Sequence, residues 1–112
     1  MPPSLSTLAA HAEKEFEFLR KAGLDTVERH VAGESSYRGG FDLIFRRRDT
    51  MCKVEYGDCE FSVVWNGEYV FGADSHPGFS GNMFSREHLD EHLPALAAAV
   101  RDALSECLQN EA

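Results

Sequence analysis

The sequence predicts one α+β domain spanning residues 1–112, in which an N-terminal helix, an antiparallel meander of four or five strands and a C-terminal helix follow one another. Three observations lead to this fold class. Hydrophobic residues recur at helical spacing near both ends of the chain, they alternate with polar residues in between, and short turn sequences separate the alternating runs. Two helices that flank a meander are expected to pack on one face of its sheet.

The first predicted helix spans Ser4–Ala22. Its hydrophobic residues lie three or four positions apart, as one face of a helix requires, and charged side chains occupy most of the other positions. Ser4 follows two prolines and is a suitable N-cap, whereas Gly23 can adopt the left-handed conformation that ends a helix. The hydrophobic face consists of Leu5, Leu8, Ala12, Phe16 and Leu19.

Strands are predicted where the period changes to two. Val27–Val31 is a short candidate strand, and three longer alternating runs follow it between residues 41 and 65. Asn66-Gly67 is a strong signal for a two-residue hairpin, because both residues accept positive φ, and it leads into a last strand ending at Phe71. The alternating hydrophobic residues are Phe41, Leu43, Phe45, Cys52, Val54, Tyr56, Phe61, Val63 and Trp65.

Residues 72–84 follow neither period and are rich in glycine, which predicts an irregular segment. A second helix is expected after it, with Ser85 as its N-cap. Pro94 lacks a backbone N–H and disfavours helical geometry at the preceding residue, so we expect the regular helix to begin at Pro94 and to run to Leu108. Its hydrophobic face consists of Leu89, Leu93, Leu96, Val100, Leu104 and Leu108.

The composition is that of an acidic, folding protein. Hydrophobic residues make up 43% of the chain, and 11 basic and 19 acidic residues give a net charge of −8. Phosphate backbones are bound by Lys and Arg, so nucleic acid is not an expected partner, whereas a basic protein is. No apolar run is long enough to span a bilayer and no signal peptide is evident, so we expect no membrane association. Three cysteines in apolar surroundings fit buried thiols in the cytoplasm.

The stretch HLDEH matches the inverted zinc peptidase pattern, in which two histidines one helical turn apart bind the metal. A catalytic zinc also needs a third protein ligand. Glu106 and Glu111 follow on the same terminal helix or its frayed end, and they cannot fold back onto His88 without a hinge that the sequence does not show. We therefore predict no metal site, and we interpret His88 and His92 as part of a solvated polar face.

No other motif predicts catalysis. Asp74, Ser75 and His76 are neighbours on one segment, whereas the members of a catalytic triad come from separate elements. The basic run Arg46–Arg48 alternates between the faces of a strand and is interpreted as a solvated hairpin tip. The sequence thus predicts neither catalytic residues nor a cofactor, and it favours a non-enzymatic protein.

The candidate binding residues lie on and near the irregular segment. Phe79, Met83 and Phe84 are large hydrophobic residues in a glycine-rich stretch, so they either cover the core as a lid or form an exposed patch for a partner. Trp65 and Tyr69, which flank the Asn-Gly turn, extend this patch if they point outward. Asp74 adds negative charge to it.

Three stretches of the sequence, EFEFLRKAGL, VVWNGEY and FSREHLDEHLPALAAAVRDAL, together with the order of the elements, resemble the small acidic α+β immunity proteins that bacteria encode beside polymorphic toxins. The resemblance covers nearly the whole chain. It implies a non-enzymatic inhibitor that binds a cognate toxin tightly in the cytoplasm of the producing cell. The acidic surface of the chain would then cover a basic domain of that toxin.

Two alternatives remain open at this stage. One is a small enzyme or ligand-binding domain with a pocket between sheet and helices, where Asp74, His76 and Tyr69 lie near the mouth. The other is a housekeeping subunit of a homo-oligomer joined by an exposed edge of the sheet.

Overall fold

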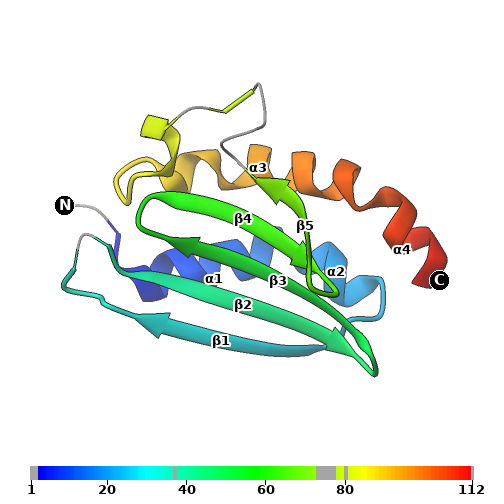
Figure 1. The fold of residues 1–112 in the computed structure, drawn as a ribbon. Helices are drawn as coiled ribbons and strands as arrows, with labels where there is room; N and C mark the ends of the chain where they lie inside the picture. The colour runs from blue at the N-terminus through cyan, green and yellow to red at the C-terminus, as the bar shows by residue number, and fades with distance from the viewer. Residues whose placement is uncertain (1–2, 37, 73–77, 80, 112) are drawn as a thin grey trace.

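A computed structural model of the chain describes residues 3–36, 38–72, 78–79 and 81–111. One five-stranded antiparallel sheet lies against a layer of helices, and the strands follow one another across the sheet in chain order (Figure 1). The α+β fold and its meander are as predicted. The helices cover one face of the sheet, and the other face, toward the viewer in Figure 1, has no helix on it among the described residues.

The strands are β1 (Thr26–Ala32), β2 (Gly40–Arg47), β3 (Thr50–Gly57), β4 (Glu60–Trp65) and β5 (Glu68–Gly72). Two tight turns have positive φ at both central residues, as two-residue hairpins require. At the predicted turn, Asn66 and Gly67 have φ of 48° and 87°, and at the β3–β4 turn Asp58 and Cys59 have 51° and 59°. The predicted hairpin tip at Arg46–Arg48 is exposed, as expected.

The N-terminal helix is divided into α1 (Leu5–Glu15) and α2 (Glu17–Lys21) by Phe16, whose φ and ψ of −93° and 16° are not helical. Ser4 is the N-cap, and its side-chain oxygen accepts a hydrogen bond from the backbone N–H of Thr7 at 3.0 Å. Gly23 has a φ of 114°, as its position after the helix predicts.

The C-terminal helix corrects two predictions. Helix α3 (Leu89–Ala103) runs through Pro94 instead of beginning there, and its N-cap is His88 rather than Ser85. Pro94 is only six positions into the helix and its side chain is exposed, so the proline costs one backbone hydrogen bond near the start of the helix. A short helix α4 (Ser105–Glu111) follows a break at Leu104.

The core lies between the sheet and the helices. Alternate strand residues meet one face of α1 and α3, and no polar or charged residue is buried in the described part of the chain. The hydrophobic faces predicted for the two helices are buried as expected, apart from the half-buried Leu108. A single hydrophobic core thus holds the helical layer on one side of the sheet. None of the described helices is both long and apolar enough to cross a membrane.

Candidate functional site

The described part of segment 72–84 packs on the core. Phe84 ends the short 3-10 helix η2 (Gly81–Phe84) and is only 1% exposed, and its carbonyl oxygen accepts a hydrogen bond from the Tyr56 hydroxyl at 2.6 Å. Phe79 is half-buried, with its ring 6.2 Å from the rings of both Phe71 and Phe84. Met83 is half-buried against the same cluster. These contacts are those of a lid on the core.

The two aromatic residues beside the Asn-Gly turn lie on opposite sides of the sheet. Trp65 is 9% exposed and belongs to the core, whereas Tyr69 is 71% exposed. Asp74, together with Ser75 and His76, lies outside the described residues. Of the candidate binding residues that the structure describes, Tyr69 is thus the one that is exposed.

A register shift explains how Tyr69 turns outward. Val63 pairs with Phe71 while Val64 pairs with Tyr69, which leaves Val70 as an extra residue in β5. In a regular strand, residues two apart share a face, so Tyr69 would lie beside Phe71 in the core. The bulge instead places Phe71 in the core and Tyr69 on the open face of the sheet.

The histidines of the HLDEH stretch contact carboxylates of the helical layer. His88 Nδ1 lies 3.1 Å and His92 Nε2 3.6 Å from the same oxygen of Glu91. Asp90 lies 2.6 Å from Nδ1 of His11, on α1. In the described part of the chain, no group of three or more His, Cys, Asp or Glu side chains could hold a metal ion.

The uncovered face of the sheet, which we call the open face, carries the strand residues that alternate with those of the core. Many of them are polar, and Ile44 and Val64 are exceptions. One row of directly opposed residues crosses all five strands. It runs through His30, Asp42, Glu55, Ser62 and Gly72. The next row ends at Tyr69, which pairs with Val64.

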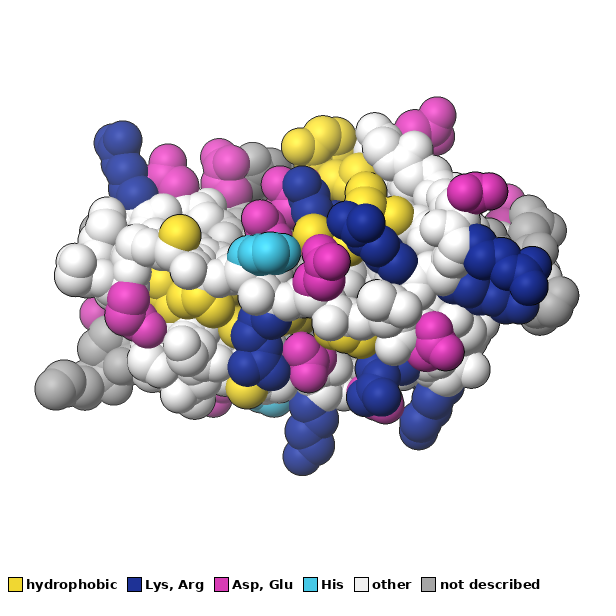
Figure 2. All heavy atoms as spheres, turned by 90° about the horizontal axis from the view of Figure 1, so that it is seen from below, with side chains coloured by type: hydrophobic (Ala, Val, Ile, Leu, Met, Phe, Trp, Pro, Cys, Tyr) yellow, Lys and Arg dark blue, Asp and Glu magenta, His cyan; other side chains and the backbone are white. Residues whose placement is uncertain are grey.

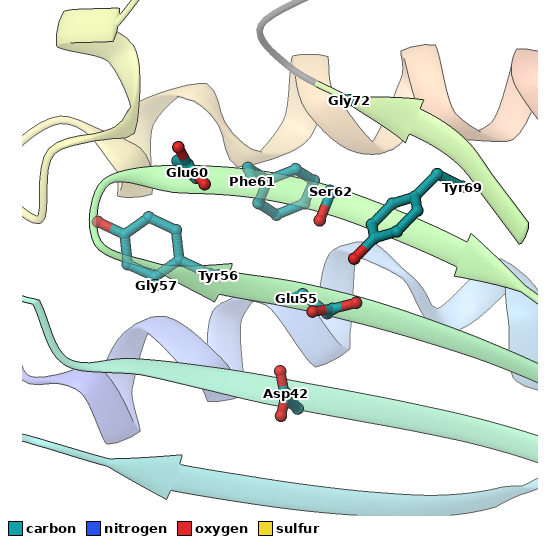
Figure 3. A pocket seen from close by; sticks show the side chains of 9 residues that line it. All are labelled: Asp42, Glu55, Tyr56, Gly57, Glu60, Phe61, Ser62, Tyr69 and Gly72. Atoms are coloured by element: carbon teal, nitrogen blue, oxygen red, sulfur yellow. The ribbon is translucent and has the colours of Figure 1, made fainter. Parts of the chain in front are cut away.

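Residues of these rows, together with Glu60 at the start of β4, line a concave site on the open face. A hollow of about 480 Å³ lies over β2 to β5, and Figure 3 shows Tyr69 reaching from β5 across β4 toward Glu55 and Ser62. Asp42, on β2, lies beside Glu55, on β3, and Glu60 lies at the start of β4 (Figure 3). Acidic side chains and an exposed aromatic ring thus line one hollow, and we refer to Asp42, Glu55, Glu60, Ser62 and Tyr69 as the acidic concavity.

The charges in the acidic concavity are only partly balanced. Asp42 and Glu55 are directly opposed across two strands, an arrangement of like charges that costs stability. Lys53 Nζ lies 3.8 Å from Glu55, whereas Asp42 and Glu60 form no ion pair with any described residue. A partner that brings positive charge to this surface would relieve the repulsion.

Sequence reasoning did not single out Asp42, Glu55 or Glu60. The strand pattern already placed all three at polar positions, so the signal was present in the alternation of residues 41–65. What was missing was the strand register, which brings them together, and the identity of the uncovered face.

Comparison with known proteins gives no relative. No protein-family model matches the chain, and no curated protein or solved structure matches it significantly.

Proposed function

We propose that the protein is a non-enzymatic binding protein that uses the open face of its sheet, and that it acts in the cytoplasm as an immunity-type inhibitor of a toxin with a basic domain. The single observation that carries this proposal is the acidic concavity, in which three carboxylates line the same hollow as a tyrosine that is 71% exposed. Exposed tyrosines are frequent anchors of protein interfaces, and acidic rims steer basic partners toward them.

The charge of the whole molecule supports the same partner. A net charge of −8 attracts a basic protein over a distance of about 8 Å at physiological ionic strength. The directly opposed pair of Asp42 and Glu55 supports it further, because a purely structural sheet surface gains nothing from two adjacent carboxylates.

A pocket between sheet and helices, the alternative raised by the sequence, receives less support. The buried residues in that layer are all hydrophobic in the described part of the chain, and Tyr69 faces away from it. A ligand site needs a few polar groups that converge on a cavity, and here such groups converge on the open face instead.

The proposal can be tested by co-expressing the protein with toxins encoded by adjacent genes and measuring cell growth. Wild-type protein should restore growth in the presence of its cognate toxin. Tyr69→Ala should raise the dissociation rate of the purified complex about 30-fold, as expected of an anchor worth about 2 kcal/mol. Ser105→Ala, an exposed position on the helical side, is the control and should bind like wild type.

If Tyr69→Ala protects growth and binds the toxin as well as wild type does, the interface lies elsewhere on the protein. Absence of any protective or binding activity toward the neighbouring toxins would reject the inhibitor role.

A further inference from the structure

Strand β1 forms one edge of the sheet and presents a seven-residue backbone to solvent. It pairs with β2 along its whole length on one side, and on the other side no described strand covers it. Six of its residues are exposed and Val27 is half-buried, and it contains no proline or bulge that would block further pairing. Figure 2 looks onto the molecule from this side, where acidic, basic and hydrophobic side chains are interspersed.

We propose that β1 pairs antiparallel with β1 of a second copy of this chain. The strand Thr26–Ala32 is centred on Arg29, so the register that pairs all seven residues with their counterparts places a twofold axis at Arg29. In this register Glu28 of each copy lies opposite His30 of the other, and Val27 lies opposite Val31.

The sequence VERHV is therefore self-complementary when two copies run antiparallel. Pairs of β-branched residues stabilise a sheet, and so do opposite-charge pairs, which Glu28 and His30 form when the imidazole is protonated. Val31 is one of the two large hydrophobic residues that are exposed in the described structure, and the pairing covers it. Shifting either copy by two residues would set Glu28 against Glu28 or His30 against His30.

The like-charged contact at the axis is already compensated within each copy. Arg29 faces Arg29 of the second copy, but its guanidinium lies 3.2 Å from the carboxylate of Glu13 on α1. Glu28 also has contacts within the chain, at 3.6 Å from His30 and 3.7 Å from Arg46. Its side chain is 45% exposed, so it can turn from these neighbours toward the second copy.

A twofold axis perpendicular to the sheet keeps the helical layers of both copies on one side. The result is a continuous ten-stranded sheet, twice the five strands of one copy, in which the two open faces lie side by side. Pairing of β1 with itself closes the assembly as a dimer, whereas pairing of β1 with β5 would continue into a filament. The dimer would present two acidic concavities on one surface.

Analytical ultracentrifugation of the purified protein alone tests this inference. Wild type should show a concentration-dependent equilibrium between monomer and dimer. H30E sets a second carboxylate opposite Glu28 of the other copy and should weaken dimerisation about 10-fold or more. The exchanged variant E28K/H30E restores opposite charges across the axis and should dimerise like wild type.

A mixing experiment separates pairing from effects on folding. E28K/H30K and H30E should each be largely monomeric alone, and their equimolar mixture should form a heterodimer, because lysines of one chain then oppose glutamates of the other. The control Asp102→Lys on α3 should leave the dimer intact. Thermal melts check that all variants are folded.

A wild-type protein that stays monomeric at about 1 mM would overturn the inference. So would a dimer that H30E does not weaken, or a mixture of the two charged variants that does not associate. Because no other protein is present, these outcomes do not depend on the proposed inhibitor function.

Discussion

The two faces of the sheet are built from alternate residues of the same strands, yet one is a closed hydrophobic core and the other an open polar surface. In β2, Leu43 is completely buried beneath the helices, whereas the next residue, Ile44, is half-buried on the open face. The covered face contains no buried polar or charged residue among those described. Asp42 and Glu55 oppose each other on the other face. The difference shows that the hydrophobic core lies on one face of the sheet, whereas the acidic concavity lies on the other.

The largest expected effect is a loss of stability when a side chain of the covered face is truncated, compared with truncation of its neighbour on the open face. Leu43→Ala removes a buried side chain and should lower the free energy of unfolding by about 2–5 kcal/mol. Ile44→Ala, one residue further along the same strand, should cost less than about 1 kcal/mol because its side chain is partly solvated already. Urea unfolding followed by circular dichroism measures both.

Equal losses for the two variants would mean that the open face is buried in solution. In that case something covers it, and the contrast between the faces does not hold for the free protein.

A smaller effect on stability is expected at the contact between the β1–β2 connection and the helical layer. Both carboxylate oxygens of Glu34, in the β1–β2 connection, accept a hydrogen bond from the backbone N–H of Leu5 at 2.9 Å. Arg86, which precedes α3, forms an ion pair with the same carboxylate. The Leu5 N–H is the main cause that lowers the pKa of Glu34 below its ordinary value of 4.5, and Arg86 acts in the same direction.

Because the folded protein prefers the ionised form, Glu34 stabilises the fold above the ordinary pKa, and this contribution is lost as pH falls through the lowered value. The melting temperature of wild type should therefore exceed that of Glu34→Gln at neutral pH. The difference should shrink as the pH is lowered below about 4.5 and the carboxylate becomes protonated. A difference in melting temperature that does not change with pH would show that the charge of Glu34 does not contribute to stability.

The smallest expected effect is the chemical modification of a buried cysteine, which tests whether solvent reaches the covered face. Burial, with a further contribution from Cys107, raises the pKa of the Cys52 thiol to about 12. In the folded protein, iodoacetamide at about pH 8 should modify the half-buried Cys59 and Cys107 well before Cys52. Unfolding in urea should make all three equally reactive. Mass spectrometry of the labelled peptides would reveal early modification of Cys52, which would contradict a closed core.

The strands and one hairpin could be predicted because their physics is local. Phe41, Leu43 and Phe45 recur at every second position of the sequence, and the conformational freedom of Asn66 and Gly67 specifies their turn. Pro94 was misjudged because the proline rule is also local, whereas packing of Leu93 and Leu96 in the core holds the helix together on both sides of it.

The same signals predict the strand positions of the site residues but not their assembly into one site. Asp42, Glu55 and Tyr69 come together through the strand register and through the bulge in β5. Neither the register nor the bulge can be read from the hydrophobic periodicity of the sequence. Arg86 and Glu34 are 52 residues apart in the sequence, and their contact depends on how the layers stack. The segment with Phe79 and Phe84 attracted attention because hydrophobic residues in a loop are conspicuous, but these rings pack against each other and the core.

The central claim is that the open face is the surface that meets a basic partner. It is tested most directly by measuring association rates with the isolated partner on a biosensor, over a range of salt concentrations. The variant E55K/E60K changes the acidic concavity, and D102K/E106K changes exposed positions on α3 and α4. Each replaces two acidic by two basic residues and shifts the net charge by +4, from −8 to −4.

The account predicts that E55K/E60K lowers the association rate about 10-fold or more at low salt, and that D102K/E106K lowers it by no more than about 3-fold. The two rates should converge as added salt screens the charges. Equal reductions by both variants would mean that only the net charge matters, and a larger reduction by D102K/E106K would place the interface on the helices.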